Sequence, residues 1–164
     1  METRSFLLDM DVGIDDAVAI IFLAMQSNVE IVALGSVHGN VDSTNAALNA
    51  LRTFEICGKY NIPVAIGAAE PLAQPVEIAS HVHGDDGLGN TYLPLPQGRP
   101  TGEHAVDQIL RLSHERPGEL DLLAVGPLTN IGLALQRDPL VLTRFRSVVI
   151  MGGAGVEQPP DEEL

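Results

Sequence analysis

Short runs of consecutive apolar residues alternate along the chain with longer stretches in which apolar residues recur every three or four positions. The first pattern predicts buried strands and the second predicts helices that pack through one face. Strands are predicted over residues 5–10, 30–38, 63–66, 120–125 and 147–151. Helices are predicted over residues 16–27, 42–60, 103–115 and 127–137. Residues 70–100 are rich in proline and glycine and are predicted to form a long loop.

The regular alternation of strands and helices indicates parallel strands joined by right-handed crossovers. Because the strands are apolar throughout, helices are expected to cover both faces of the sheet. We therefore expect an α/β fold with a doubly wound, mostly parallel sheet of about five strands. Residues 1–154 are predicted to form this domain, and the acidic residues 155–164 are predicted to be a disordered tail.

The composition narrows the range of partners. The 164 residues include nine lysines and arginines against 22 aspartates and glutamates, a net charge of −13. So acidic a chain is a poor ligand for nucleic acid or anionic membranes, which attract basic surfaces. A lone Cys57 excludes an intramolecular disulfide, and the longest apolar run, residues 17–25, is far shorter than the ~20 residues of a membrane helix. No signal peptide is recognisable, so a cytoplasmic protein is expected.

Four carboxylates, Asp9, Asp11, Asp15 and Asp16, lie within eight residues where the first predicted strand ends and the first helix begins. In doubly wound sheets ligands bind at this edge. Such a concentration of negative charge needs a cation or protons to offset it, and oxygen donors favour Ca²⁺ or Mg²⁺. Gly13 is predicted to allow a sharp turn that brings these side chains together. The alternative is that they are helix caps and solvated strand ends.

Other predicted strands also end in polar or glycine-rich sequence. Asn40 follows the second strand and could offer an amide to a ligand or act as a turn residue. Gly126 follows the fourth strand and would leave the carbonyl of Val125 accessible. His83 is one of two histidines in the long loop, which could be a metal pair or a substrate lid. Met151 and two glycines end the fifth strand, where tight packing is the simple explanation.

Residues 8–20, LDMDVGIDDAVAI, resemble the DxDxGxDDAxAI signature of the inosine–uridine preferring nucleoside hydrolase family. Further matches, in the same order and spacing, are Gly39-Asn40, His83-Gly84, GPLTN at residues 126–130 and VIMGG at residues 149–153. The resemblance extends from about residue 5 to 154. It departs at Val12, where the family usually has proline.

The resemblance implies hydrolysis of the N-glycosidic bond of ribonucleosides to ribose and free base, with a bound Ca²⁺. Asp11 would be both a calcium ligand and the base that activates water, and Asp16 and the carbonyl of Val125 would be further ligands. The remaining assignments are ribose contacts for Asp15, Asn40 and Met151, a nucleobase contact for His83, and a supporting role for Asp9. A ribonucleoside is uncharged, which suits a chain with few cations.

Family members continue beyond the Met-Gly-Gly strand with a ribose-binding segment and a late His-Asp pair, whose Asp completes the calcium shell. These have no counterpart here, so we expect a truncated or frameshifted product or a fragment, with reduced or absent activity. One alternative is an inactive metal-binding or oligomerising remnant, because a halved sheet would expose an apolar edge and favour a homo-oligomer. Another is a haloacid-dehalogenase-like phosphatase, which would need the only lysine, Lys59, near the phosphate.

Overall fold

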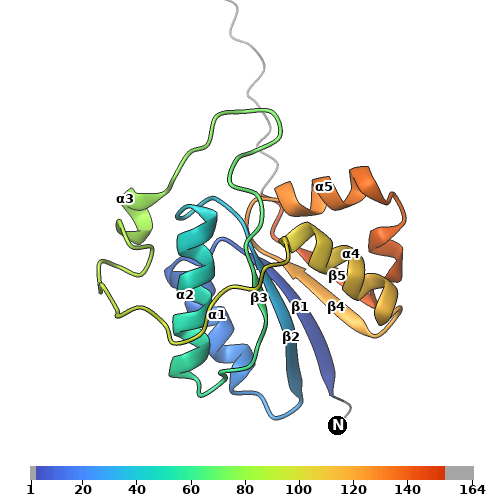
Figure 1. The fold of residues 1–164 in the computed structure, drawn as a ribbon, viewed down its shortest axis with the longest axis horizontal. Helices are drawn as coiled ribbons and strands as arrows, with labels where there is room; N and C mark the ends of the chain where they lie inside the picture. Colours follow the sequence, from blue (N-terminus) through green and yellow to red (C-terminus); the bar gives the residue numbers. More distant parts are fainter. Residues whose placement is uncertain (1–2, 154–164) are drawn as a thin grey trace, which may run out of the picture.

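A computed structural model of the chain describes residues 3–153, so the tail predicted over residues 155–164 lies outside the described residues. The strands are β1 (Arg4–Met10), β2 (Val29–Ser36), β3 (Val64–Ala65), β4 (Leu120–Ala124) and β5 (Ser147–Ile150). The helices are α1 (Ile14–Ala24), α2 (Ser43–Ile56), α3 (Ser80–His83), α4 (Ala105–Glu115), α5 (Thr129–Arg137) and the 3₁₀ helix η1 (Val141–Arg144). The five strands are all parallel, in the order β3-β2-β1-β4-β5 (Figure 1).

Neighbouring residues of the central strand pack into two separate apolar layers. Leu7 packs with Ile109 of α4 in one layer, and Leu8 packs with Ile20 of α1 and Phe54 of α2 in the other. Figure 1 shows α1 and α2 on one side of β1 and β2, and α4 and α5 on the opposite side. Because successive strand residues point to opposite faces, a strand covered on both sides must be apolar throughout. The predicted doubly wound α/β fold is confirmed.

The element boundaries differ from the predicted ones in a few places. The second helix ends at Ile56 rather than at residue 60, and Gly58 just beyond it has φ +70, a conformation that ends helices. The fourth predicted helix begins at Thr129, so residue 127 is not in its first turn. The predicted loop contains α3, whose four residues are too few to show a helical period. Asp42 is the N-cap of α2, accepting from the backbone of Thr44 at 3.0 Å.

The fold brings the loops that follow different strands to one edge of the sheet. Chain order reverses direction at β1, which lies between β2 and β4. The backbone N–H of Val125 donates to the carbonyl of Asp9 at 3.0 Å, and Met151 donates to Ala124 at 2.9 Å. The ends of β1, β4 and β5 are therefore directly linked beyond the strands themselves. This reversal point is where open α/β sheets bind ligands.

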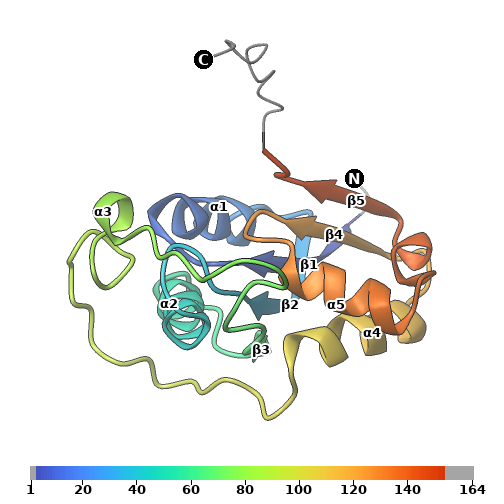
Figure 2. The same cartoon turned by 90° about the horizontal axis from the view of Figure 1, so that it is seen from above.

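The strand β5 lies at one edge of the sheet and β3 at the other (Figure 2). The side chain of Val149 on β5 is 54% exposed and Ile150 is 41% exposed, as is much of the apolar surface of α1. An exposed edge of this kind agrees with the expected tendency to associate, and the homo-oligomer remains a prediction. Among residues 3–153, no helix has the length and apolar character needed to cross a membrane.

The amino ends of β1, β4 and β5 are joined by a buried charge. Asp121 on β4 accepts hydrogen bonds from Arg4 Nε at 2.8 Å, Arg146 Nε at 3.0 Å and Ser147 Oγ at 2.6 Å. Burial raises the pKa of Asp121, but these hydrogen bonds outweigh it and place the pKa well below its ordinary value. The carboxylate thus joins β1, β4 and β5 near their amino ends, away from the carboxyl ends of the strands.

We predict that Asp121→Asn lowers the free energy of unfolding by about 2 kcal/mol near pH 7, because hydrogen bonds to a charged group are lost. A depressed pKa stabilises the fold above the ordinary pKa of the unfolded carboxyl, and this contribution is lost as pH falls through the folded pKa. The difference between the two proteins should therefore shrink towards about pH 3. Urea unfolding at both pH values measures it.

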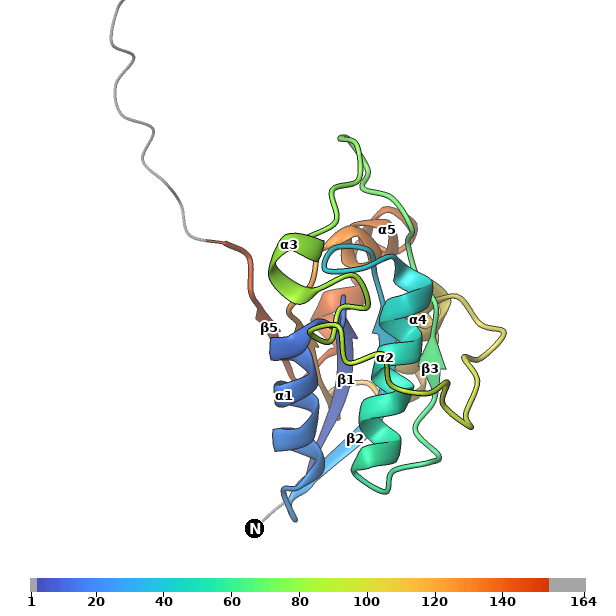
Figure 3. The same ribbon diagram turned by 90° about the vertical axis from the view of Figure 1, so that its left-hand side faces the viewer.

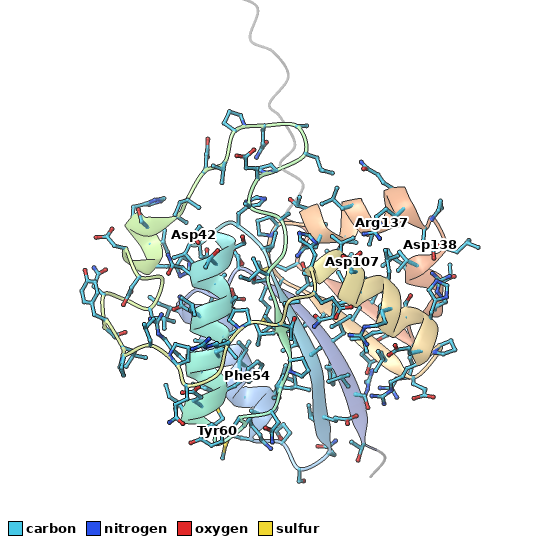
Figure 4. The ribbon with its side chains drawn as sticks, viewed as in Figure 1. Asp42, Phe54, Tyr60, Asp107, Arg137 and Asp138 are labelled. Atoms are coloured by element: carbon cyan, nitrogen blue, oxygen red, sulfur yellow. The ribbon has the colours of Figure 1, made fainter. Side chains whose placement is uncertain are left out.

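The control is Asp107→Asn, which removes a surface ion pair in which Arg137 Nη1 lies 2.6 Å from Asp107 Oδ1 (Figure 4). An exposed pair contributes roughly 0.5 kcal/mol, so this change should be small. Equal losses for the two variants, or a loss for Asp121→Asn that does not depend on pH, would contradict the account.

Candidate active site

A cleft of about 540 Å³ lies at the carboxyl ends of the strands. It is lined by Asp11, Asp15, Asn40, His83, Val125, Gly126, Pro127, Met151, Gly152 and Gly153. Six of the eight residues predicted from the sequence to form the site are in this lining, although they come from five separate segments. The other two, Asp9 and Asp16, are buried next to it. The predicted convergence of the strand ends is therefore present in the structure.

Asp11 follows β1 directly and is only 6% exposed. Its Oδ2 accepts a hydrogen bond from the backbone N–H of Asn40 at 2.8 Å. Two glycines make room for the carboxylate: a Cβ on Gly39 would overlap Oδ2, and a Cβ on Gly126 would come within 2.8 Å of Oδ1. The glycines after β2 and β4 thus keep this carboxylate open to the cleft.

Asp16 is in the first turn of α1 and is 4% exposed. Its Oδ2 accepts from the backbone N–H of Gly13 at 3.1 Å, as an acidic residue does in a capping box. The side-chain amide of Asn40 approaches the same oxygen at 3.4 Å. Asn40 therefore contacts both Asp11 and Asp16 and holds the two carboxylates together. A residue that served only the turn would make neither contact.

Gly13 has a different role from the predicted one. Its φ is −96, which any residue can adopt, so a sharp turn is not the reason for glycine here. A Cβ at this position would lie 2.5 Å from Asn40 Nδ2 and 2.7 Å from His83 Nδ1. Glycine is needed because two side chains of the cleft pack directly against the backbone.

The electrostatics of the pair favour protons or a cation. Burial raises the pKa of Asp11, and burial followed by the charge of Asp11 raises the pKa of Asp16 to about 7. The hydrogen bonds from Asn40 and Gly13 lower these pKa values but offset only part of the rise. Two ionised carboxylates at this depth therefore need a positive charge beside them.

Asp9 lies beneath the pair and is fully buried. Its Oδ2 accepts from Asn130 Nδ2 at 2.8 Å, and its Oδ1 has no hydrogen-bond partner among the described residues. Burial raises the pKa of Asp9 to about 7. Asn130 also donates to the carbonyl of Ser36 at 2.9 Å and accepts from Ala68 N at 2.9 Å. It thus joins α5 to three segments below the site.

The sequence marks Asn130 only as part of the GPLTN match at residues 126–130, near the start of the predicted helix. Its role could not be predicted, because its partners are up to 121 residues away. A second link of this kind is the contact between His38 Nε2 and Thr129 Oγ1 at 3.0 Å, which ties the end of β2 to α5. Burial lowers the pKa of His38.

His83 and Asp15 lie at the outer rim of the cleft. Figure 3 shows α3, which ends at His83, beside the start of α1. His83 Nδ1 accepts from the backbone N–H of Ile14 at 3.2 Å, so a neutral ring carries its proton on Nε2. The Asp15 side chain is 66% exposed, with Oδ1 3.8 Å from His83 Nδ1. Both residues line the cleft.

The candidate metal ligands near the cleft are oxygen atoms. Within residues 3–153, no three side chains of His, Cys, Asp or Glu converge as a metal site. The pair Asp11 and Asp16, with the carbonyl of the cleft residue Val125, is an all-oxygen set that suits Ca²⁺ or Mg²⁺. The pairing of two buried carboxylates fits such an ion.

The position of Lys59 argues against phosphate chemistry. This lysine lines a separate hollow with Val29 and Glu30, at the beginning of β2 and away from the carboxylates. A phosphatase of the haloacid-dehalogenase type needs the lysine beside the phosphate. That alternative is therefore wrong for this cleft.

The comparisons with known proteins agree with the fold. The sequence profile described as inosine-uridine preferring nucleoside hydrolase matches residues 6–158. The parallel sheet with this carboxylate cleft is thus that of a nucleoside hydrolase domain. The chain belongs to the inosine-uridine preferring nucleoside hydrolase family.

Individual relatives match almost the whole chain. It is 41% identical over 150 residues to a probable uridine nucleosidase 1 of Oryza sativa subsp. japonica, and 40% identical over 153 residues to an inosine-uridine preferring nucleoside hydrolase of Leishmania major. A solved plant nucleoside hydrolase, PpNRh1, superimposes with a TM-score of 0.87 at 38% identity. These alignments cover 90%, 92% and 92% of the chain but 46%, 48% and 48% of those proteins, so the chain spans about half their length.

We predict that, without divalent cations, the free energy of unfolding of the parent chain falls relative to that of the Asp9→Asn variant as pH rises from about 4 to 7. The raised pKa means that the folded state holds a proton which the unfolded state has released, so stability is present at low pH and is lost as pH rises through about 7. The expected slope is up to about 1.4 kcal/mol per pH unit, levelling above about pH 7.

Thermal unfolding of both proteins in a chelator, across this pH range, measures the difference. Asn at position 9 keeps an oxygen that can accept the hydrogen bond from Asn130. Titration of His38 occurs in both proteins and therefore cancels in the difference between their stabilities. A difference that stays constant with pH would show that Asp9 is ionised throughout.

Proposed function

We propose that this cleft carries the chemistry of a calcium-dependent ribonucleoside hydrolase, which cleaves the N-glycosidic bond to give ribose and free base. The observation that carries the proposal is the buried pair of Asp11 and Asp16, held together by Asn40 beside the cleft. No lysine or arginine is among the described residues lining the cleft. A neutral nucleoside fits this surface, whereas a phosphorylated substrate would be repelled.

Asp11 is the proposed base. It borders the cleft, Asn40 fixes one of its oxygens, and Gly126 leaves the other without a covering side chain. A carboxylate whose pKa is raised by burial is a stronger base towards water than a free one. The water attacks the anomeric carbon of ribose and gives a proton to the Asp11 carboxylate, while the bond to the base breaks and its electron pair leaves with the base. The departing base takes a proton from solvent, which gives the neutral free base. General-base assistance of this kind contributes ~10²–10⁴-fold.

Asp11, Asp16 and the carbonyl of Val125 are the residues that would hold Ca²⁺. When bound, the ion supplies positive charge that orients the ribose hydroxyls and makes a nearby water more acidic. The carboxylates of the site also favour the positive charge that develops on ribose as the base departs. The raised pKa of Asp16 supports this role, because a cation replaces the protons that the buried pair otherwise retains.

The rim residues are proposed to bind substrate. Asp15 and Asn40 offer an acceptor and an amide towards ribose, and Met151 lies at the end of β5 beside the sugar. His83 presents its Nε2–H towards the nucleobase. The names of the rice and Leishmania relatives, uridine nucleosidase and inosine-uridine preferring nucleoside hydrolase, support a ribonucleoside as the substrate class.

A second candidate is an inactive metal-binding remnant. The observation favouring it is that, among the described residues, only two carboxylates are placed to hold the ion. This candidate predicts calcium binding without turnover. A cytoplasmic location and a homo-oligomer remain predictions.

We predict that Asp11→Asn abolishes ribose release from inosine or uridine, with at least about a 100-fold loss, because an amide cannot accept the proton from water. The matched control is Asp85→Asn, which changes an exposed carboxylate of the same loop as His83. A reducing-sugar assay on the intact chain measures both. Retained turnover in Asp11→Asn would contradict the proposed base, and calcium binding with no turnover by the parent chain would favour the remnant.

We also predict that Ca²⁺ raises the thermal midpoint, since an ion that binds only the folded state stabilises it, by ~2.7 kcal/mol at 100 times its Kd. Asp16→Asn should lose most of this shift and Asp85→Asn none. Differential scanning fluorimetry with and without millimolar Ca²⁺ is the measurement. The absence of a shift in the parent would exclude a calcium site assembled from these residues.

A further inference from the structure

The mechanism leaves one fully buried amide unexplained. Asn49 is on the buried side of α2 and is 0% exposed. Its Nδ2 donates to two backbone carbonyls, that of Val12 at 3.2 Å and that of Asp86 at 2.8 Å. Val12 lies between Asp11 and Gly13 in the carboxylate loop, whereas Asp86 lies in the loop that follows His83. One side chain thus connects the two loops that supply the cleft.

The orientation of this amide is fixed from its other end. Asn49 Oδ1 accepts from Arg52 Nη1 at 2.7 Å, so the NH₂ group must face the two carbonyls. Arg52 Nε in turn donates to the carbonyl of Pro94 at 3.0 Å, farther along the same loop. Both hydrogens of the amide are used, and neither partner belongs to α2. Stabilising the helix itself would require neither contact.

The loop that receives this contact is internally locked. The Asp86 carboxylate accepts from the backbone N–H groups of Leu88 at 2.8 Å, Asn90 at 2.8 Å and Tyr92 at 2.7 Å. Gly89 N donates to the carbonyl of His83 at 2.8 Å, which attaches His83 to the same unit. Residues 83–92 are therefore expected to move together, and a restraint on Asp86 is a restraint on His83.

His83 is the functional end of this unit. Its Nδ1 accepts from Ile14 N at 3.2 Å, at the start of α1 and next to the carboxylate loop. Asn49 and the contact between His83 and Ile14 thus attach the same loop unit at two points to residues 12–14. Loss of one attachment would leave the loop to pivot about the other.

We propose that Asn49 is a positioning residue, which sets the place and ring orientation of His83 relative to Asp11 by joining Val12 to Asp86. The inference rests on the proposed function for its catalytic consequence, since His83 is there a nucleobase contact. Its structural part stands on the hydrogen bonds alone. Placement by a buried amide is effective because an unpaired donor or acceptor there would be costly.

The backbone N–H of Ile14 reports on this placement directly. The first amides of a helix have no partner within the helix, so the protection of Ile14 from hydrogen exchange comes from His83. Asn49→Asp preserves size but removes both donors. We expect its Ile14 amide to exchange about tenfold faster and the His83 ring nitrogens to lose their single-tautomer ¹⁵N shifts. Thr53→Val is the control, because it removes a buried hydrogen bond to Asn49 O within α2 and none of the hydrogen bonds to the loops.

A pair of loop variants tests the same contact without changing α2. Gly87 has φ +77, and a Cβ there would come within 2.7 Å of Val41 Cγ1 and within 2.9 Å of Asn49 Nδ2. Gly89 has a similar φ of +71, but an added Cβ would meet only Ile14 Cδ1 at an ordinary 3.7 Å. The two alanine substitutions carry similar backbone strain, so only Gly87→Ala should expose the Ile14 amide and alter the His83 ring.

The inference is overturned if Ile14 stays protected in both Asn49→Asp and Gly87→Ala, or if the controls lose protection equally. Where the chain turns over ribonucleoside, Asn49→Asp and His83→Ala should each lower kcat/KM, and the double variant should be no worse than His83→Ala. Additive losses in the double variant would also overturn it. Absence of turnover in every protein would count against the proposed function alone, because the exchange and ¹⁵N measurements decide the inference without catalysis.

Discussion

The proximity of Asp11 and Asp16 is the constraint on which the rest of this structure depends. Each carboxylate is almost fully buried, and the charge of Asp11 raises the pKa of Asp16. A folded chain keeps such a pair only if protons or a cation offset the charge. The surrounding contacts are arranged to hold the pair open towards the cleft rather than to neutralise it. Gly39 and Gly126 have no side chain to cover the Asp11 carboxylate. No lysine or arginine is among the described residues that line the cleft.

Asparagine residues position the carboxylates and the loops around this pair through hydrogen bonds. From the end of β2, Asn40 donates its backbone N–H to Asp11 and its side-chain amide to Asp16, and Asn130 supports Asp9 from α5. Asn49 performs the corresponding task from α2 for the loop that bears His83. An amide supplies donors without adding charge, so it can orient carboxylates and carbonyls while leaving a position for a metal ion. A lysine or arginine in the same places would neutralise the pair.

The fold and the composition of the cleft were predictable because they depend on local patterns. Continuous apolar runs marked the strands, and polar residues where those runs end, such as Asp11 and Asn40, marked the edge where ligands bind. The partners of Asn130 and Asn49 were not predictable, because they depend on contacts between segments 37 to 121 residues apart. Gly13 was assigned to a turn, since close packing by His83 becomes visible only when α3 is placed beside α1.

Proton release on calcium binding tests the central claim, that Asp11 and Asp16 form a cation site, most directly. The measurement is isothermal titration calorimetry of the chain with Ca²⁺ near pH 6.5, in two buffers of different ionisation enthalpy. Because Ca²⁺ must displace protons held by carboxyls with raised pKa values, the account predicts binding heats that differ between buffers and an interaction that Asp16→Asn removes. Heats that do not depend on the buffer, or undetectable binding by the parent chain, would contradict it.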